Sequence, residues 1–137
     1  MITGGNALRA RMKAVGLAFK PVGKAWADKT AQKAKPRVPQ RTGRLRASIK
    51  RKSATQKRAT VVGHFTAYFI DAGVRPHEIK PKQGKRLVFQ GARGTVFARK
   101  VHHRGYGARP FRARSANEAL AETWDKDAIV DAWNKGA

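Results

Sequence analysis

The sequence predicts an α+β fold, with a long N-terminal helix, an antiparallel sheet of four to five strands and a C-terminal helix packed on the sheet. Two observations predict it. Apolar residues recur at helical spacing near both ends of the chain, and the middle alternates apolar with polar residues between Gly and Pro. A chain of 137 residues has room for one core, so we expect a single domain over 1–137.

The N-terminal helix is predicted over residues 6–35. Its larger apolar side chains follow one another at steps of three and four residues, the spacing of one helix face. They are Leu8, Met12, Val15, Phe19, Val22 and Trp26. Pro21 interrupts this face, because its ring clashes with the carbonyl four residues back, so we expect a kink there or two helices.

A β-meander is predicted over residues 44–101. Leu45, Ala47 and Ile49 alternate with polar residues, which is typical of a strand with one face in water. Residues 60–65 form the next predicted strand. Residues 86–90 and 95–101 are expected to pair as a hairpin around a Gly-containing turn. Long loops are predicted at 73–85 and 102–110, where Gly and Pro gather.

The C-terminal helix is predicted over residues 111–134. Ala116, Leu120 and Trp124 repeat every four residues. Residues 110–137 contain five acidic and four basic side chains, whereas residues 1–60 contain 17 basic side chains and one acidic one. This helix is therefore the element best suited to lie against the basic remainder of the chain.

The chain carries 31 Lys and Arg against 8 Asp and Glu, a formal net charge of +23. Such a protein attracts a polyanion or an acidic partner. The densest basic cluster supplies our candidates for contact with DNA phosphates. They are Arg41, Arg44, Arg46, Lys50 and Lys52. Alternation along a strand would place Arg46, Lys50 and Lys52 on one face. A solvated face balanced by an acidic neighbouring protein is the alternative, and Gly43 in this stretch suits a turn of positive φ.

The sequence does not favour catalysis. There is no cysteine, carboxylates suited to acid/base work are missing from the basic part, and no acidic residue lies within ten positions of His102 and His103. We expect no enzyme, no catalytic residue, no metal and no cofactor. No apolar run is long enough for a membrane span, so we expect a soluble protein made in the cytoplasm, with no membrane partner.

Three stretches together resemble one family. Val38 to Ile49 is similar to its "P-x-R-T-G-x-L-R-x-S-I" signature. Tyr68 to His77 resembles "Y-x-x-x-x-x-G-T-R-P-H" and Ile79 to Phe89 resembles "I-x-P-K-x-G-K-x-L-x-F". Val96 to Phe111 resembles "V-x-x-x-V-x-H-P-G-x-x-A-x-P-F". The family is the small minor tail or neck protein of long-tailed bacteriophages, called tail-completion, tail-terminator or head-tail joining protein.

The resemblance implies a virion structural protein that forms a ring, commonly a hexamer. Its implied partners are copies of itself, the tail tube protein, and the portal or head-completion (adaptor) proteins, with packaged DNA contacted nonspecifically at most. The implied location is the head-tail neck of the virion, after assembly in the host cytoplasm. Val74 and Arg104 depart from the family pattern, which has threonine and proline there.

The motifs also supply candidates for docking onto a neighbouring subunit or ring. They are Arg75, Pro76, His77, Arg109, Pro110 and Phe111. The alternative is that these residues close loops and that Phe111 anchors the last helix. The predicted function is the tail-terminator or tail-completion ring. The alternatives are a head-closure ring on the portal side and, in a different class, a free basic nucleic-acid-binding protein.

Overall fold

A computed structural model describes residues 5–136, and its chain divides into two compact units. Unit 1 contains the described residues 5–67 and 110–136, and unit 2 is Tyr68–Arg109. The α+β class is confirmed, with a long N-terminal helix, antiparallel strands and helices at the C-terminal end. The prediction of a single domain stays a prediction.

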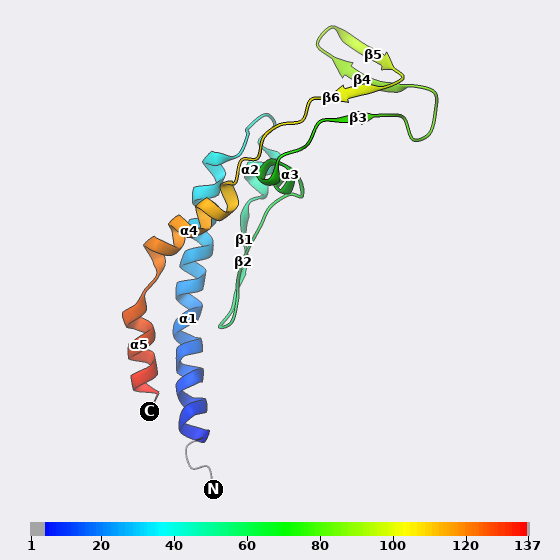
Figure 1. Ribbon diagram of the computed structural model, residues 1–137. Helices are drawn as coiled ribbons and strands as arrows, with labels where there is room; N and C mark the ends of the chain where they lie inside the picture. Colours follow the sequence, from blue (N-terminus) through cyan, green and yellow to red (C-terminus); the bar gives the residue numbers. More distant parts are fainter. Residues whose placement is uncertain (1–4, 137) are drawn as a thin grey trace. The chain divides into compact units, whose positions relative to one another are not determined.

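In unit 1 a long helix lies beside a hairpin and two shorter helices (Figure 1). Helix α1 is Gly5–Ala34 and continues into the 3₁₀ turn η1, Lys35–Arg37. Helix α2 is Arg44–Ser48, and the hairpin strands are β1, Lys50–Ala54, and β2, Ala59–Val62. Helix α3, Thr66–Ala72, crosses the boundary between the units. Helices α4, Phe111–Thr123, and α5, Lys126–Lys135, both pack on α1.

Helix α1 runs through Pro21 as one continuous helix, so the alternative of two helices is wrong. Its buried positions also differ from the predicted apolar stripe. Leu8 and Met12 are 51% and 63% exposed, and the buried residues of the helix are small ones. They are Gly23, Ala27, Thr30, Ala31 and Ala34. Small residues let two helix backbones approach closely, and α4 contributes the buried Ser115 and Ala119 to this core.

Residues 45–49 were predicted as a strand, and that prediction is wrong. Leu45 and Ile49 are both buried while Ala47 is exposed, which is the i, i+4 pattern of a helix turn rather than the i, i+2 pattern of a strand. Gly43 is the N-cap residue that precedes α2, and its φ is 68°, a conformation that glycine adopts without steric cost. The first hairpin of the chain is therefore β1–β2, which starts at Lys50.

The predicted C-terminal helix is two helices. Trp124 is extended, and the Asp125 side chain caps the start of α5 by accepting a hydrogen bond from the Ala128 N–H at 2.9 Å. On another side of α1, β1 and β2 pair antiparallel, and the register is irregular between Arg51 and Ser53.

Unit 2 consists of two ribbons of two antiparallel strands. Strand β3, His77–Ile79, lies inside the predicted loop 73–85 and pairs with β6, Val101–His103, which begins at the last residue of the predicted strand 95–101 and runs into the predicted loop 102–110. The prediction that these segments are loops throughout is wrong. Strand β4, Leu87–Gly91, pairs with β5, Gly94–Ala98, as the predicted hairpin. The prediction of a single sheet of four to five strands is wrong, because the six strands in the described part of the chain form three separate pairs. Period-two patterning identifies strands, but it does not say which edges pair.

Candidate assembly surfaces

The five basic candidates for phosphate contact are all exposed, but they do not share one strand face. Arg44 and Arg46 belong to α2, and Arg46 Nη1 donates to the Gln40 Oε1 atom at 3.0 Å. Lys50 and Lys52 lie in β1, and Arg41 precedes α2. The expected face of Arg46 with Lys50 and Lys52 is therefore wrong, because Arg46 is helical.

Strand β1 turns a different basic side chain toward α1. Arg51 is partly buried, and its Nε donates to the Asp28 carboxylate of α1 at 2.7 Å. Lys50 and Lys52, on either side of it, remain exposed. The hairpin thus keeps two ammonium groups available for an anionic partner.

The docking candidates of the stretch Tyr68 to His77 lie beside residues of the stretch Val96 to Phe111. His77 and His103 are register partners in β3 and β6, and their rings stack with centroids 5.0 Å apart. Val74 and Tyr106 exchange two backbone hydrogen bonds, at 2.9 and 3.0 Å. Two segments that resemble the family signature are therefore the two sides of one ribbon.

Gly105 makes this pairing possible. Its φ is 73°, and a Cβ there would collide with the backbone of Val74 and lie 2.8 Å from the Pro76 nitrogen. Arg75 and Pro76 are exposed next to it, and the Arg75 carbonyl lies 2.9 Å from His77 Nδ1. Arg75 and Pro76 thus help to close the ribbon while their side chains remain accessible.

The second group of docking candidates is divided between the two units. In unit 2 the Arg109 N–H donates to the Ile70 carbonyl at 3.0 Å. In unit 1 Pro110 precedes α4 and Phe111 is only 5% exposed. Phe111 therefore has the position expected of an anchor for the last helix, which was the alternative to docking.

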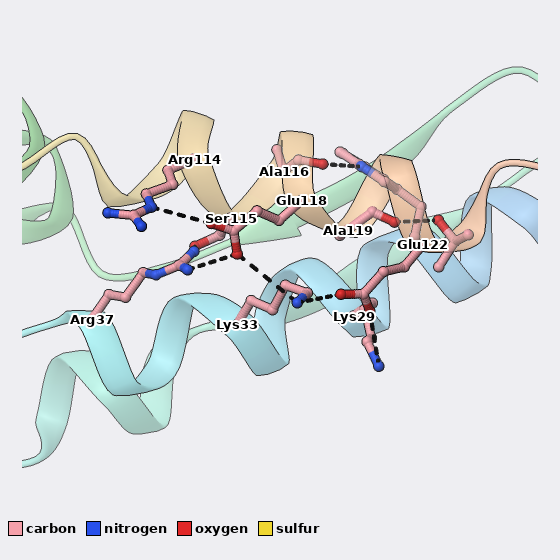
Figure 2. A network of polar contacts seen from close by, with 11 residues as sticks. Lys29, Lys33, Arg37, Arg114, Ser115, Ala116, Glu118, Ala119 and Glu122 are labelled. Atoms are coloured by element: carbon pink, nitrogen blue, oxygen red, sulfur yellow. Dashed lines mark hydrogen bonds and ion pairs between the residues drawn. The ribbon is translucent and has the colours of Figure 1, made fainter.

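Helix α4 is held on α1 by an ion-pair network (Figure 2). Arg37 donates to the Glu118 carboxylate at 2.6 Å and to the Ser115 hydroxyl at 3.0 Å. Glu122 pairs with Lys33 at 2.6 Å and with Lys29 at 3.2 Å. The expectation that the acidic C-terminal segment lies against basic residues is met at α4, although the charge count could not identify the pairs.

These contacts lower the pKa values of both glutamates. Hydrogen bonds from Arg37 and then Arg114 hold the pKa of Glu118 below its ordinary value. Hydrogen bonds from Lys33 and Lys29 lower the pKa of Glu122 in the same way. In unit 2 the pKa of Glu78 is lowered chiefly by the hydrogen bond from Lys100, at 3.2 Å. All three carboxylates serve as ion-pair partners.

Unit 1 contains an open aromatic pocket between α1, α4 and the turn of the β1–β2 hairpin. Phe19, Trp26 and Trp124 line it, with Lys57 and Arg58 on the hairpin side. Trp26 Nε1 donates to the Ala116 carbonyl at 3.0 Å, which fixes this ring against α4.

Within residues 5–136, no group of three His, Asp or Glu side chains gathers as a metal site would require.

Unit 2 lacks buried residues, which its sequence motifs do not predict. Every one of its residues is half-buried or exposed, so it has no core of its own. Its β4–β5 hairpin exposes large apolar side chains on both faces: Val88, Phe89, Val96 and Phe97. The period-two pattern predicts this hairpin, but an apolar strand residue is ordinarily expected to be buried, so the exposure of these side chains could not be predicted from the pattern.

Comparison with models of protein families, with curated proteins and with solved structures finds no significant match to the chain. None of the described helices has an apolar stretch long enough to cross a bilayer.

Proposed function

We propose that the chain is a structural protein of the neck of long-tailed bacteriophages, forming the tail-terminator or tail-completion ring that joins the tail tube to the head. The observation that carries the proposal is that unit 2, which contains most of the family-like motifs, has no buried residue. A ribbon of this kind is marginally stable in water, and neighbouring subunits would supply the missing burial.

The charge supports the same role. A net charge of +23 favours contact with DNA or with acidic neighbouring proteins. A channel that passes DNA needs weak contacts that do not depend on sequence. The exposed Arg41, Arg44, Lys50 and Lys52 would provide such contacts to phosphates. A ring with these basic side chains toward its lumen would supply weak contacts to DNA of any sequence.

Size-exclusion chromatography with light scattering tests the proposal. Purified, nuclease-treated chain is measured alone and then with purified tail tubes and with filled heads, each without free DNA. The proposal expects a discrete oligomer that binds tube ends. Binding to heads alone would favour a ring on the portal side. A chain that stays monomeric, ignores both particles and binds DNA with a steep salt dependence would be a free nucleic-acid-binding protein and would overturn the proposal.

A further inference from the structure

The β4–β5 hairpin has one face that combines apolar and basic side chains. Residues directly opposite in an antiparallel pair lie on the same face, so Val88 and Phe97 form one cross-strand pair. They are 61% and 62% exposed. Gln90 and Thr95, two positions further along, share this face and are joined by a hydrogen bond of 3.0 Å.

Two arginines extend this face at the open end of the hairpin. Arg86 comes directly before β4 and Arg99 directly after β5, and the period of two places both on the side of Val88 and Phe97. Both are exposed, and neither forms an ion pair with the part of the chain that the structure describes. No acidic residue occurs in the sequence between Glu78 and Glu118. We call Arg86, Val88, Phe97 and Arg99 the hairpin patch.

Helix α5 carries a patch of the opposite charge. Asp127 and Asp131 are four residues apart and Val130 is three residues after Asp127, so all three lie on the exposed side of the helix, with Lys126 before them and Lys135 after them. Val130 is 46% exposed and both aspartates are exposed. Within residues 5–136, neither aspartate forms an ion pair, in contrast to Glu118 and Glu122 of α4. We call these three residues the helix patch.

We propose that the hairpin patch of one copy docks on the helix patch of a second copy. Each patch combines exposed apolar surface with two like charges, which are two arginines near Val88 and Phe97 and two aspartates near Val130. The charges of the two patches are opposite. DNA phosphates would match the arginines but would leave Val88 and Phe97 in water, whereas the helix patch offers two carboxylates to the arginines and Val130 to the apolar side chains. Two different patches make a head-to-tail contact, which closes into a ring when the rotation per subunit allows it.

The contact rests on the proposed function for its setting in a ring, and charge exchange tests it separately. One variant carries Arg86→Glu and Arg99→Glu, and a second carries Asp127→Lys and Asp131→Lys. Each alone places like charges opposite each other, and we expect self-association to weaken on the order of 100-fold. When the two variants are mixed, opposite charges meet only where a subunit of one variant contacts a subunit of the other. We therefore expect assembly to return, in particles that contain equal numbers of the two variants. One chain carrying all four changes should assemble by itself.

A matched control reverses two exposed lysines of α1, Lys13→Glu and Lys24→Glu, with the same change in net charge as the arginine variant. We expect it to assemble as the unaltered chain does. Light scattering gives the particle mass, native mass spectrometry gives the composition of mixed particles, and urea unfolding checks that each variant is folded.

The outcomes separate the two proposals. If the unaltered chain binds tube ends and assembles, but both reversed variants assemble equally well, the patch contact is wrong and the neck function stands. Recovery in the four-change chain without recovery in the mixture would mean a contact within one copy and would overturn docking between copies. Loss of DNA retention with unchanged assembly would assign the arginines to DNA instead. Failure of the unaltered chain to assemble or bind tubes would contradict the neck function itself.

Discussion

The close approach of the two sides of unit 2 requires glycine at position 105, as it does at Gly73, where an added Cβ would lie 2.7 Å from the Ala108 nitrogen. A methyl group at position 105 would meet the Val74 carbonyl and the Pro76 nitrogen while the backbone holds a φ of 73°. We expect Gly105→Ala to separate the Val74–Tyr106 pair and to reduce assembly at least tenfold, leaving the thermal unfolding of unit 1 unchanged. Light scattering and circular dichroism measure the two effects.

Gly84→Ala is the matched control, because Gly84 also has a positive φ but nothing lies within 4 Å of its added Cβ. Its exposed loop can readjust, so we expect assembly close to that of the unaltered chain. Equal losses in both variants would contradict the importance of the close approach at Gly105.

Glu118 makes the docking of α4 sensitive to acid. Its pKa is lowered from 4.5 in the folded chain, chiefly by the hydrogen bond from Arg37. The folded state therefore binds fewer protons than the unfolded state as the pH falls. The stabilisation is complete above about pH 4.5 and is lost as the pH drops through the lowered pKa. We expect urea unfolding midpoints measured from pH 6 to pH 3 to fall less steeply in Glu118→Gln.

Asp131→Asn serves as the comparison for this titration when both variants are measured as dilute, unassembled chain, because Asp131 forms no ion pair within the described part of one copy. It should keep the steep acid dependence of the unaltered chain. If Glu118→Gln has the same slope as Asp131→Asn, the carboxylate of Glu118 does not contribute to the acid response.

At the scale of elements, helix α1 is continuous although it contains Pro21, a residue that destabilises the interior of a helix. Pro21 lacks the N–H of an interior hydrogen bond, and an interior proline costs a helix about 3 kcal/mol. We expect Pro21→Ala to raise the free energy of unfolding by about 1–3 kcal/mol, measured in urea. Lys20→Ala, at the neighbouring exposed position, should change it by less than about 0.5 kcal/mol. A loss of stability in Pro21→Ala would show that the proline is favourable where it stands.

The elements differ in how far local sequence determined them. The β4–β5 hairpin was predictable because alternation and a Gly-containing turn agree. Residues 45–49 were mistaken for a strand because Leu45 and Ile49 fit both periods, and only the tertiary contacts that bury them decide. The break before α5 did have a local signal, since Asp125 is a favoured N-cap residue.

The candidate sites show the same limit. The basic residues and the segments 75–77 and 102–105 could be identified from the sequence, but the pairing of His77 with His103 depends on contacts between residues distant along the chain. It also could not separate Phe111, which is buried, from Arg75, which is exposed, because both lie in similar loop motifs. Exposure depends on the three-dimensional packing of the whole unit, and motif spacing does not encode it.

At the scale of the whole molecule, the excess of positive charge should appear in binding to DNA. We expect Lys50→Gln with Lys52→Gln to weaken retention of duplex DNA by the assembled protein equally for unrelated sequences. Each lost phosphate contact should reduce the slope of log affinity against log salt by about 1. Filter binding at several salt concentrations measures it, with Lys13→Gln and Lys24→Gln as the comparison. An unchanged slope would exclude these two lysines from DNA contact.

The proposed function requires that unit 2, which lacks a core, is stabilised by neighbouring subunits. Amide hydrogen exchange of Leu87 to Ala98, compared between dilute chain and chain assembled on tail tubes, tests it most directly. We expect fast exchange of β4 and β5 in the dilute chain, slow exchange in α1, and at least tenfold slower exchange of the hairpin on assembly. A hairpin already as protected as α1 in the dilute chain, and unchanged on assembly, would show that neighbouring subunits do not stabilise unit 2.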